Sequence, residues 1–218
     1  MSTLFKFDCC HRQKSSYAAG RGGARWSSPL CDAVAGGDVD VIRDLLTSKS
    51  SVNQLNAAYD TPLHIAAQHG NCDVTRLLLT AGADVNQGAR FMHGTPLFAA
   101  AAHGHHEVAK ALIEAKASVN QINAAGNAPL HTAVVKAGAE FLSTVEALLD
   151  ARALVNQPDK DGRTPLMLAA SKGNMDVYRP LLGAGADLQV ADSQGRTAQS
   201  YFDEMRQQPL RGGRCVLM

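Results

Sequence analysis

The chain of 218 residues lacks a long hydrophobic run and is poor in aromatic residues. No stretch approaches the roughly 18 consecutive apolar residues that a helix needs to cross a bilayer. Residues 1–7 are too few and too mixed for a secretory signal, so we expect the chain to stay on the cytosolic side. Aromatic residues make up only 5% of the chain, which suits thin helices that pack at short distance.

Cysteines are too few and too scattered for a disulfide framework. The chain has five of them, an odd number, and they are spread over both ends and the middle of the sequence. Neither a disulfide pattern nor the paired spacing of a zinc site is present. We therefore expect reduced cysteines in a cytosolic protein. The five are Cys9, Cys10, Cys31, Cys72 and Cys215.

Motifs for catalysis and for cofactor binding are also missing. No G-x-x-x-x-G-K-[ST] loop occurs in the sequence. The run His103-Gly104-His105-His106 could bring two imidazoles together, but no carboxylate or cysteine cluster nearby completes a coordination set. We expect no catalytic residue, no cofactor and no metal, and therefore no enzyme.

What the sequence does contain is a repeat. The phrases TPLHIAA, TPLFAAA and TPLMLAA begin at Thr61, Thr95 and Thr164. A second phrase, Val-Asn-Gln, recurs in step with them four times. A fixed period predicts a stack of small units, and such stacks bind other molecules. The helix-starting prolines, separated by 33, 34, 33 and 36 residues, are Pro29, Pro62, Pro96, Pro129 and Pro165, and Ala198 follows 33 residues later.

Each unit has the signals of two short helices and a loop. Thr61 can cap a helix that has Pro62 in its first turn, and Gly70 can end this helix in a left-handed conformation. Apolar residues at helical spacing predict a second helix over about residues 73–81. Residues 83–94 have the composition of a hairpin loop.

This pattern resembles the ankyrin repeat family, which has a period of about 33 residues and a T-P-L-H-x-A signature. The resemblance covers about residues 26–205 and implies an all-α repeat solenoid, with paired antiparallel helices and projecting β-hairpin fingers. It also implies a monomer that binds a protein partner through its concave face and fingers. His64 and His131 would have a structural hydrogen-bonding role. The expected parts are a tail at 1–25, units near 28–60, 61–94, 95–127, 128–163 and 164–196, a partial cap at 197–205, and a tail at 206–218.

Three units depart from the pattern at a turn where the others have glycine. Lys49, Lys116 and Arg152 stand at the position of Gly82 and Gly185. A side chain in a left-handed turn costs up to about 1 kcal/mol. These turns are therefore expected to adopt another conformation or to be locally strained, unless the substitutions are tolerated surface drift.

The fourth unit is three residues longer than the usual spacing. The extra length falls between Val135 and Val145, through residues 136–142. We expect a longer or bulged turn between the two helices of this unit, which is either a partner contact or a harmless insertion.

The longer hairpin at residues 88–94 is the best candidate for partner recognition. Its tip carries Arg, Phe and Met, which are enriched at protein interfaces. In the neighbouring finger, Tyr59 stands where other units have glycine. Alternatively, Phe91 or Met92 folds back between adjacent fingers. The candidate partner-binding residues are Tyr59, Asp60, Arg90, Phe91, Met92, His93, Asn127 and Arg163.

Charge is unevenly distributed along the chain. Residues 1–25 have five cations and one acid, and residues 206–218 have three cations and no acid. Since the whole chain has a formal charge of +1, these tails of +4 and +3 leave −6 on the repeats. An acidic body argues against nucleic-acid binding, and the basic tails are expected to approach anionic surfaces.

The last four residues, Cys215-Val216-Leu217-Met218, fit the C-a-a-X prenylation motif, and a terminal Met favours farnesyl. One lipid chain gives only marginal membrane attachment, so a second signal is expected from the basic tails or from acylation of Cys9 and Cys10. The protein would then lie on the cytosolic face of a membrane, with the membrane surface as a second partner.

Two alternatives to this location remain. Residues 1–28 are rich in Ser and Arg and poor in acids, so they could form a transit peptide. The chain could also be a soluble cytoplasmic or nuclear regulator, such as an inhibitory or ubiquitin-pathway subunit, with the terminal motif unused.

Overall fold

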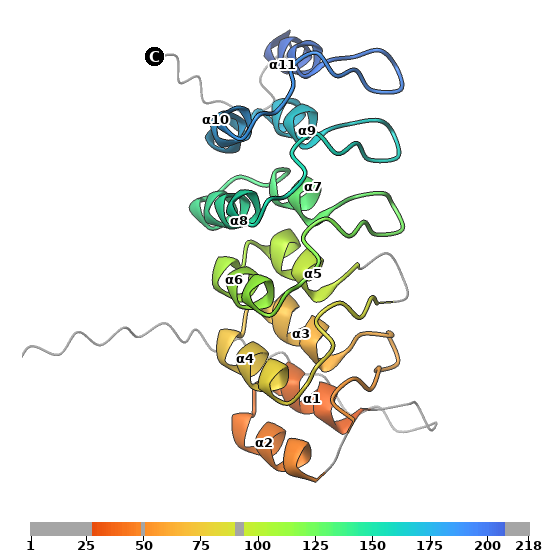
Figure 1. The fold of residues 1–218 in the computed structure, drawn as a ribbon, viewed down its shortest axis with the longest axis vertical. Helices are drawn as coiled ribbons and strands as arrows, with labels where there is room; N and C mark the ends of the chain where they lie inside the picture. Colours follow the sequence, from red (N-terminus) through yellow and green to blue (C-terminus); the bar gives the residue numbers. More distant parts are fainter. Residues whose placement is uncertain (1–27, 49–50, 90–93, 208–218) are drawn as a thin grey trace, which may run out of the picture.

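The structure, a computed structural model, describes residues 28–48, 51–89 and 94–207. These residues form an elongated stack in which inner and outer helices alternate along the chain and loops project from one edge (Figure 1). The inner helices are α1 (Pro29–Gly36), α3 (Pro62–His69), α5 (Pro96–His103), α7 (Pro129–Ala133), α9 (Pro165–Lys172) and α11 (Ala198–Gln207). The outer helices are α2 (Val39–Thr47), α4 (Cys72–Thr80), α6 (His106–Glu114), α8 (Ala139–Asp150) and α10 (Met175–Gly183).

The Thr-Pro phrase forms helix starts, as the sequence predicts. The hydroxyl oxygen of Thr61 accepts a hydrogen bond from the backbone N–H of His64 at 3.2 Å. Thr95 and Thr164 cap α5 and α9 in the same way. Gly70 ends α3 at φ 72°, a left-handed conformation that satisfies the last carbonyls of the helix. Local sequence signals therefore fix both ends of the inner helices.

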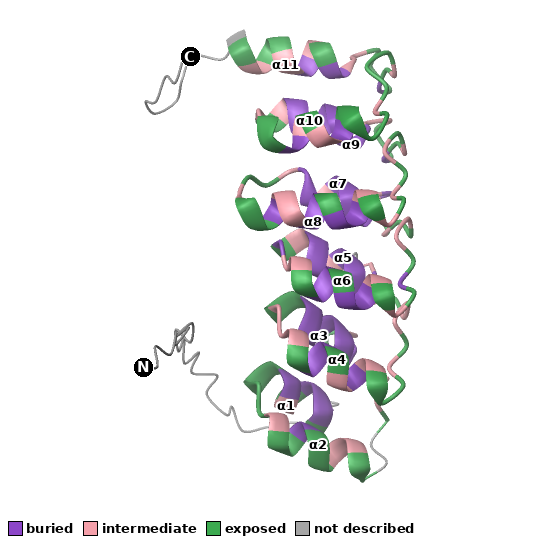
Figure 2. Ribbon diagram, turned by 60° about the vertical axis from the view of Figure 1, so that its left-hand side comes forward, coloured by how far each residue is buried: buried purple, intermediate pink, exposed green. Residues whose placement is uncertain are grey.

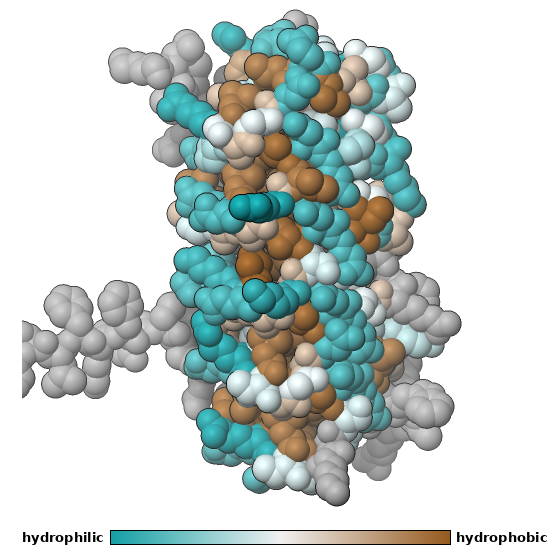
Figure 3. All heavy atoms as spheres, in the orientation of Figure 1, coloured by the Kyte–Doolittle hydropathy of each residue, from teal (hydrophilic) through white to brown (hydrophobic). Residues whose placement is uncertain are grey.

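Leucines from neighbouring units build one continuous core. The leucine after each helix-starting proline is no more than 1% exposed, and one leucine from each of α4, α6, α8 and α10 is completely buried. Buried residues therefore occur in the helices along the whole stack (Figure 2). At the surface, a broken hydrophobic band runs along the stack with hydrophilic side chains on either side (Figure 3). Each unit is thus stabilised by its neighbours.

The recurring Val-Asn-Gln phrase joins each unit to the next one. The side-chain oxygen of Asn53 accepts a hydrogen bond from the backbone N–H of Asp84 at 2.8 Å. Asn86 accepts in the same way from the N–H of Ser118 at 2.7 Å. Asn120 and Asn156 repeat this contact in the following units. The asparagine recurs because it links successive loops across the stack.

One Asn or Asp side chain organises each described finger. In the second half of the stack, Asp159 Oδ1 accepts hydrogen bonds from the N–H groups of Asp161 and Arg163, at 2.9 and 2.8 Å. Asn56, Asn123 and Asp192 do the same in their own fingers. Within the described residues, bridge pairing of the strand type is limited to one isolated bridge between Ala191 and Thr197. The described fingers are therefore tight turns that are held by side-chain hydrogen bonds, with little regular β-hairpin pairing.

The departures from glycine do not change the backbone of their turns. Lys116 and Arg152 have φ values of 68° and 62°, so they keep the left-handed conformation that Gly82 and Gly185 also adopt. The expectation of another conformation is therefore wrong for these two turns, which hold L-residues in a costly region. Lys49 lies outside the described residues.

The longer fourth unit redistributes its helices. Its inner helix α7 has only 5 residues and its outer helix α8 has 12, whereas the regular units have 8 and 9. The turn between them includes Gly138 at φ 142°. The turn between the two helices is longer, as expected. The three added residues also extend the start of the outer helix α8.

Candidate recognition surface

A groove of about 450 Å³ lies on the inner-helix side of the stack, over α5, α7 and α9. We call it the inner groove. Its size is in the range of ordinary ligand sites, and both helix residues and finger residues contribute to it. The residues that line it are Ala102, His103, Asn127, His131, Thr132, Val135, Lys136, Arg163, Leu168 and Lys172.

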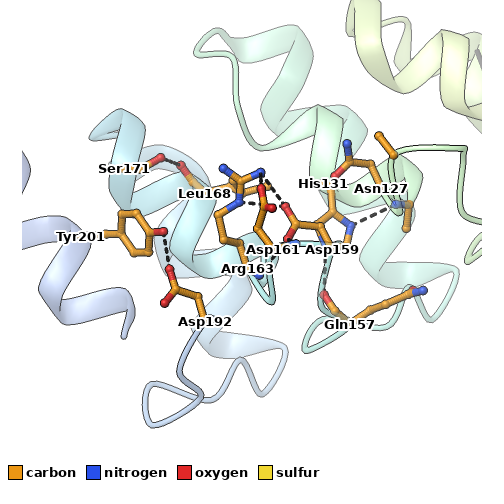
Figure 4. A network of polar contacts seen from close by, with 12 residues as sticks. Asn127, His131, Gln157, Asp159, Asp161, Arg163, Leu168, Ser171, Asp192 and Tyr201 are labelled. Carbon is orange, nitrogen blue, oxygen red and sulfur yellow. Dashed lines mark hydrogen bonds and ion pairs between the residues drawn. The ribbon is translucent and has the colours of Figure 1, made fainter. Parts of the chain in front are cut away.

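Two of the sequence-predicted partner-binding residues line the inner groove. Asn127 and Arg163 come from successive fingers, and both are partly buried. Arg163 is held in place by Asp159 and Asp161, with N–O distances of 2.8 Å to each carboxylate (Figure 4). Because Asp159 is buried and Arg163 satisfies it, the arginine fixes the shape of the groove wall while its charge is balanced locally.

The remaining charged side chains of the inner groove are basic. Lys136 Nζ donates a hydrogen bond to the carbonyl of Ala102 at 3.0 Å and lies 5.4 Å from the centre of the Phe141 ring. The ammonium group of Lys172 forms no hydrogen bond or ion pair with the residues that the structure describes. No Asp or Glu is among the lining residues. The inner groove therefore favours anionic groups.

His131 forms part of the floor of the inner groove and links the start of α7 to the finger that follows α8 (Figure 4). Its Nδ1 accepts a hydrogen bond from the N–H of Ala128 at 3.1 Å, so its Nε2–H donates to the carbonyl of Gln157 at 2.9 Å. Burial lowers the pKa of His131 below its ordinary value. His64 bridges Thr61 and the carbonyl of Gly94 in an equivalent way. The structural role expected for both histidines is confirmed.

The last finger is fixed by a compact polar network. The hydroxyl of Tyr201 donates to Asp192 Oδ2 at 2.6 Å, and Arg196 donates to the same oxygen at 2.9 Å. Burial and the bond to Asp192 raise the pKa of Tyr201 to about 12. The hydrogen bond from Tyr201 lowers the pKa of the Asp192 carboxyl well below its usual range. The tyrosine of α11 thus anchors the C-terminal finger to the stack.

The other predicted site residues do not lie on the inner groove. Tyr59 and Asp60 belong to a finger nearer the start of the stack, where Tyr59 has a φ of 63°, as its glycine-like position predicts. Tyr59 is partly buried. The remaining predicted residues lie outside the described part of the chain: Arg90, Phe91, Met92, His93, Cys9, Cys10 and Cys215.

The histidine run near the start of α6 serves packing between units. His103 Nδ1 is 3.0 Å from the carbonyl of Ala99, and His105 Nε2 is 3.0 Å from the carbonyl of Gln68 in the previous unit. The rings of His103 and His105 stack with centroids 5.9 Å apart. Burial lowers the pKa of His105. Among the described residues, no three His, Cys, Asp or Glu side chains are grouped as metal ligands would be.

Lys172 and His103 are not among the residues predicted to bind a partner, whereas Lys136 belongs to the segment 136–142, for which a partner contact is one of two expectations. The signal was present, because all three stand seven residues after a helix-starting proline. His103 and Lys172 are the last residues of α5 and α9, and Lys136 takes the equivalent position in the turn after the shorter α7.

Paired helices, shared cores between neighbours and side-chain-held fingers define a helical repeat solenoid of the kind that presents a recognition surface. Three stretches, residues 20–89, 88–159 and 139–201, match the family profile of ankyrin repeats, and the chain belongs to this family. Ankyrin repeats generally mediate protein–protein interaction, and proteins built from them are typically not enzymes. No curated protein matches the chain. In the described part, every helix is too short or too polar to cross a membrane.

Proposed function

We propose that this protein is a non-enzymatic adaptor that binds a protein partner through its inner groove and fingers. The observation that carries the proposal is the inner groove itself, where Asn127 and Arg163 from two fingers meet Leu168 and Thr132 from two inner helices. Polar groups that are fixed in place around a partly apolar floor are typical of recognition surfaces. Tyr59 and Asp60, in a finger nearer the start of the stack, and the predicted cluster at residues 90–93 are proposed to belong to the same surface.

A photo-crosslinking residue tests this half of the proposal. The crosslinker replaces Thr132 in the inner groove or, as the matched control, exposed Arg179 on outer helix α10. We expect a protein adduct from eukaryotic cytosol at position 132, competed by the unlabelled wild-type chain, and none at position 179. Adducts at position 179 alone, or none at either position, would contradict the proposal.

The predicted finger cluster is tested separately. Phe91→Ala combined with Met92→Ala should weaken capture of the crosslinked partner at least several-fold without changing the unfolding transition of the array. Unchanged capture would remove this finger from the binding surface and leave the inner groove as the recognition site.

The second half of the proposal is that the adaptor is held on a cytosolic membrane face by a farnesyl thioether at Cys215. The terminal Cys215-Val216-Leu217-Met218 motif supports it, and the arginines of residues 206–218 would add electrostatic attraction to anionic lipids. No helix long and apolar enough to span a bilayer is found in the described residues, so the attachment is proposed to be peripheral and reversible.

Metabolic labelling with a farnesyl analogue in eukaryotic cells tests the lipid anchor. We expect label on the wild-type chain, no label on Cys215→Ser, and loss of the membrane-bound fraction in the variant. An unlabelled, wholly soluble wild-type chain would instead favour a soluble regulator. Cys9→Ser with Cys10→Ser, in the same experiment, shows whether acylation of the other end contributes.

A further inference from the structure

Four units place a basic or imidazole side chain at the same position. Counted from the helix-starting proline, the eighth residue of each unit is His69, His103, Lys136 or Lys172, with spacings of 34, 33 and 36 residues. All four are exposed. We call them the basic column. The first unit has glycine at this position, Gly36, so the column begins at the second unit.

The column is continuous along the stack. Three of its members, His103, Lys136 and Lys172, line the inner groove. Lys136 reaches the preceding unit, where it donates to the carbonyl of Ala102, next to His103. The ring of His105 stacks on that of His103 and reaches the carbonyl of Gln68, next to His69, which also acts electrostatically on His105. The four side chains therefore form one row across α3, α5, α7 and α9.

The inner helices of these units add no carboxylate to this row. The helices α3, α5, α7 and α9 contain no Asp or Glu. The carboxylates of Asp159 and Asp161, at the edge of the groove, are both paired with Arg163. Glu140, at the start of α8, lies beside Gly104 and Gly138, next to the turn that holds Lys136. The inner helices of these four units therefore add no acid to the row, and Glu140 is a carboxylate that approaches it from an outer helix.

The outer helices have the opposite charge. The helices α2, α4, α6, α8 and α10 contain nine acidic and four basic residues, which leaves a net charge of −5. A strongly acidic outer face repels anions, whereas the basic column attracts them, so an anionic partner is directed to the inner face.

We propose that the basic column binds an extended, acidic segment of the partner protein. This inference rests on the proposed adaptor function and names the partner's chemistry. Neighbouring helices in a stack are about 8–10 Å apart, and an extended chain advances about 3.3 Å per residue. A carboxylate at every third residue therefore meets one column residue per unit, and a segment of about 10 to 12 residues covers all four units.

The surface suits an acidic peptide better than a nucleic acid. Single-stranded nucleic acids are bound on aromatic side chains in strongly basic channels, and no Phe, Tyr or Trp lines the inner groove. A duplex would need many phosphate contacts, whereas the column provides two lysines and two histidines beside an acidic outer face. The ammonium and imidazole groups of the column are spaced along a partly apolar groove. This spacing suits the separate carboxylates of an extended peptide.

A fluorescent 12-residue peptide with Glu at every third position, separated by Ser and Gly, tests the proposal with the full chain. We expect saturable binding that weakens as salt rises and at least about tenfold weaker binding when Gln replaces each Glu. The charge-reversed variant Lys136→Glu with Lys172→Glu should also lose about tenfold or more. The matched control, Arg43→Glu with Arg179→Glu, makes the same charge change on the outer face and should bind like the wild type.

Lys136 donates a hydrogen bond to the carbonyl of Ala102, so the charge reversal could also disturb the local fold. The milder double variant Lys136→Gln with Lys172→Gln removes both charges without reversing them and should also weaken binding. Circular dichroism checks that all variants fold. Equal losses in the inner and outer variants would overturn the proposal, as would no binding by the wild type or tighter binding of a 12-nucleotide single strand. A crosslinked partner at position 132 that is captured equally by the charge-reversed chain would retain the adaptor function and reject the acidic segment.

Discussion

The inner and outer helices of the repeat units differ in burial and in charge. In the second unit, six of the eight residues of α3 are buried, against three of the nine residues of α4. The inner helices of the four middle units carry no acid, whereas the outer helices carry nine acids against four bases. A helix that packs on both neighbours and on the fingers has few free positions, so the polar residues that it does expose are informative about binding.

The strongest test of this comparison replaces a buried inner histidine. His131→Ala removes the hydrogen bonds to the N–H of Ala128 and to the carbonyl of Gln157 and leaves a cavity beneath the inner groove. We expect a loss of about 3 kcal/mol in the free energy of unfolding. Urea denaturation followed by circular dichroism measures it.

The matched outer variant is His106→Ala. His106 is partly exposed, and its side chain contacts Glu107 at 3.0 Å on the surface of α6. We expect a loss below about 0.5 kcal/mol. If both variants lost a similar free energy of unfolding, inner and outer helices would contribute equally to stability. That result would contradict the difference in burial between them.

Protonation of His131 should lower the free energy of unfolding by less than His131→Ala does. The ring stays in place, and only the hydrogen-bond acceptor at Nδ1 is lost. Burial lowers the pKa of His131 and of His105 in the folded state, so the unfolded chain binds more protons below its ordinary histidine pKa of about 6.5. Stability is then complete above that pH and decreases as the pH falls toward the folded value. The urea midpoint of the wild type should fall from pH 7.5 to 5.5 more than that of His131→Ala, and parallel profiles would contradict the assignment.

The cap of α7 offers a gain in stability. The inner helices α3, α5 and α9 have a threonine cap, whereas α7 begins after Ala128, whose N–H is bonded to His131. In α3 a threonine and a histidine coexist at these positions. Ala128→Thr should therefore stabilise by up to about 1 kcal/mol, and Thr164→Ala should destabilise by about 1 kcal/mol. A destabilising Ala128→Thr would show that the fourth unit is not equivalent to the others.

The smallest effect is expected at a loop that follows an outer helix. Lys116 adopts a left-handed conformation that glycine adopts more easily. Lys116→Gly relieves this cost but adds entropy to the unfolded chain, so we expect a net gain of about 0.5 kcal/mol. Lys110→Gly, inside α6, should instead cost about 1 kcal/mol. Thermal melts of both variants measure the difference, and a loss at position 116 would reject the strained-turn interpretation.

Local signals in the sequence were sufficient for the fold. Thr61 and Gly70 have capping preferences that act within one turn of helix, so they predict the ends of α3 without knowledge of the rest of the chain. The outcome for the fourth unit was less predictable, because three added residues can lengthen either a turn or a helix. In the structure α8 is a longer helix, and it packs against both α6 and α10.

The binding surface was predicted only in part, for a physical reason. Charge summed over the whole repeat body gives an acidic protein, and this sum hides the separation of charge between inner and outer helices. Asn127 and Arg163 were predicted from their place in the fingers, whereas Lys172 is recognised only when the eighth residues of all units are placed side by side. Which side chains share a surface depends on stacking, which one unit alone does not contain.

The central claim is that the inner face recognises the partner and the outer face does not. An amide NMR titration of the full chain with the Glu-containing 12-residue peptide tests it most directly. The account predicts shifts at residues beside the basic column, namely Gly70, Gly104, Ala137 and Gly173, and unchanged amides in α2, α4 and α10. Shifts confined to the outer helices, or no shifts at saturating peptide, would contradict it.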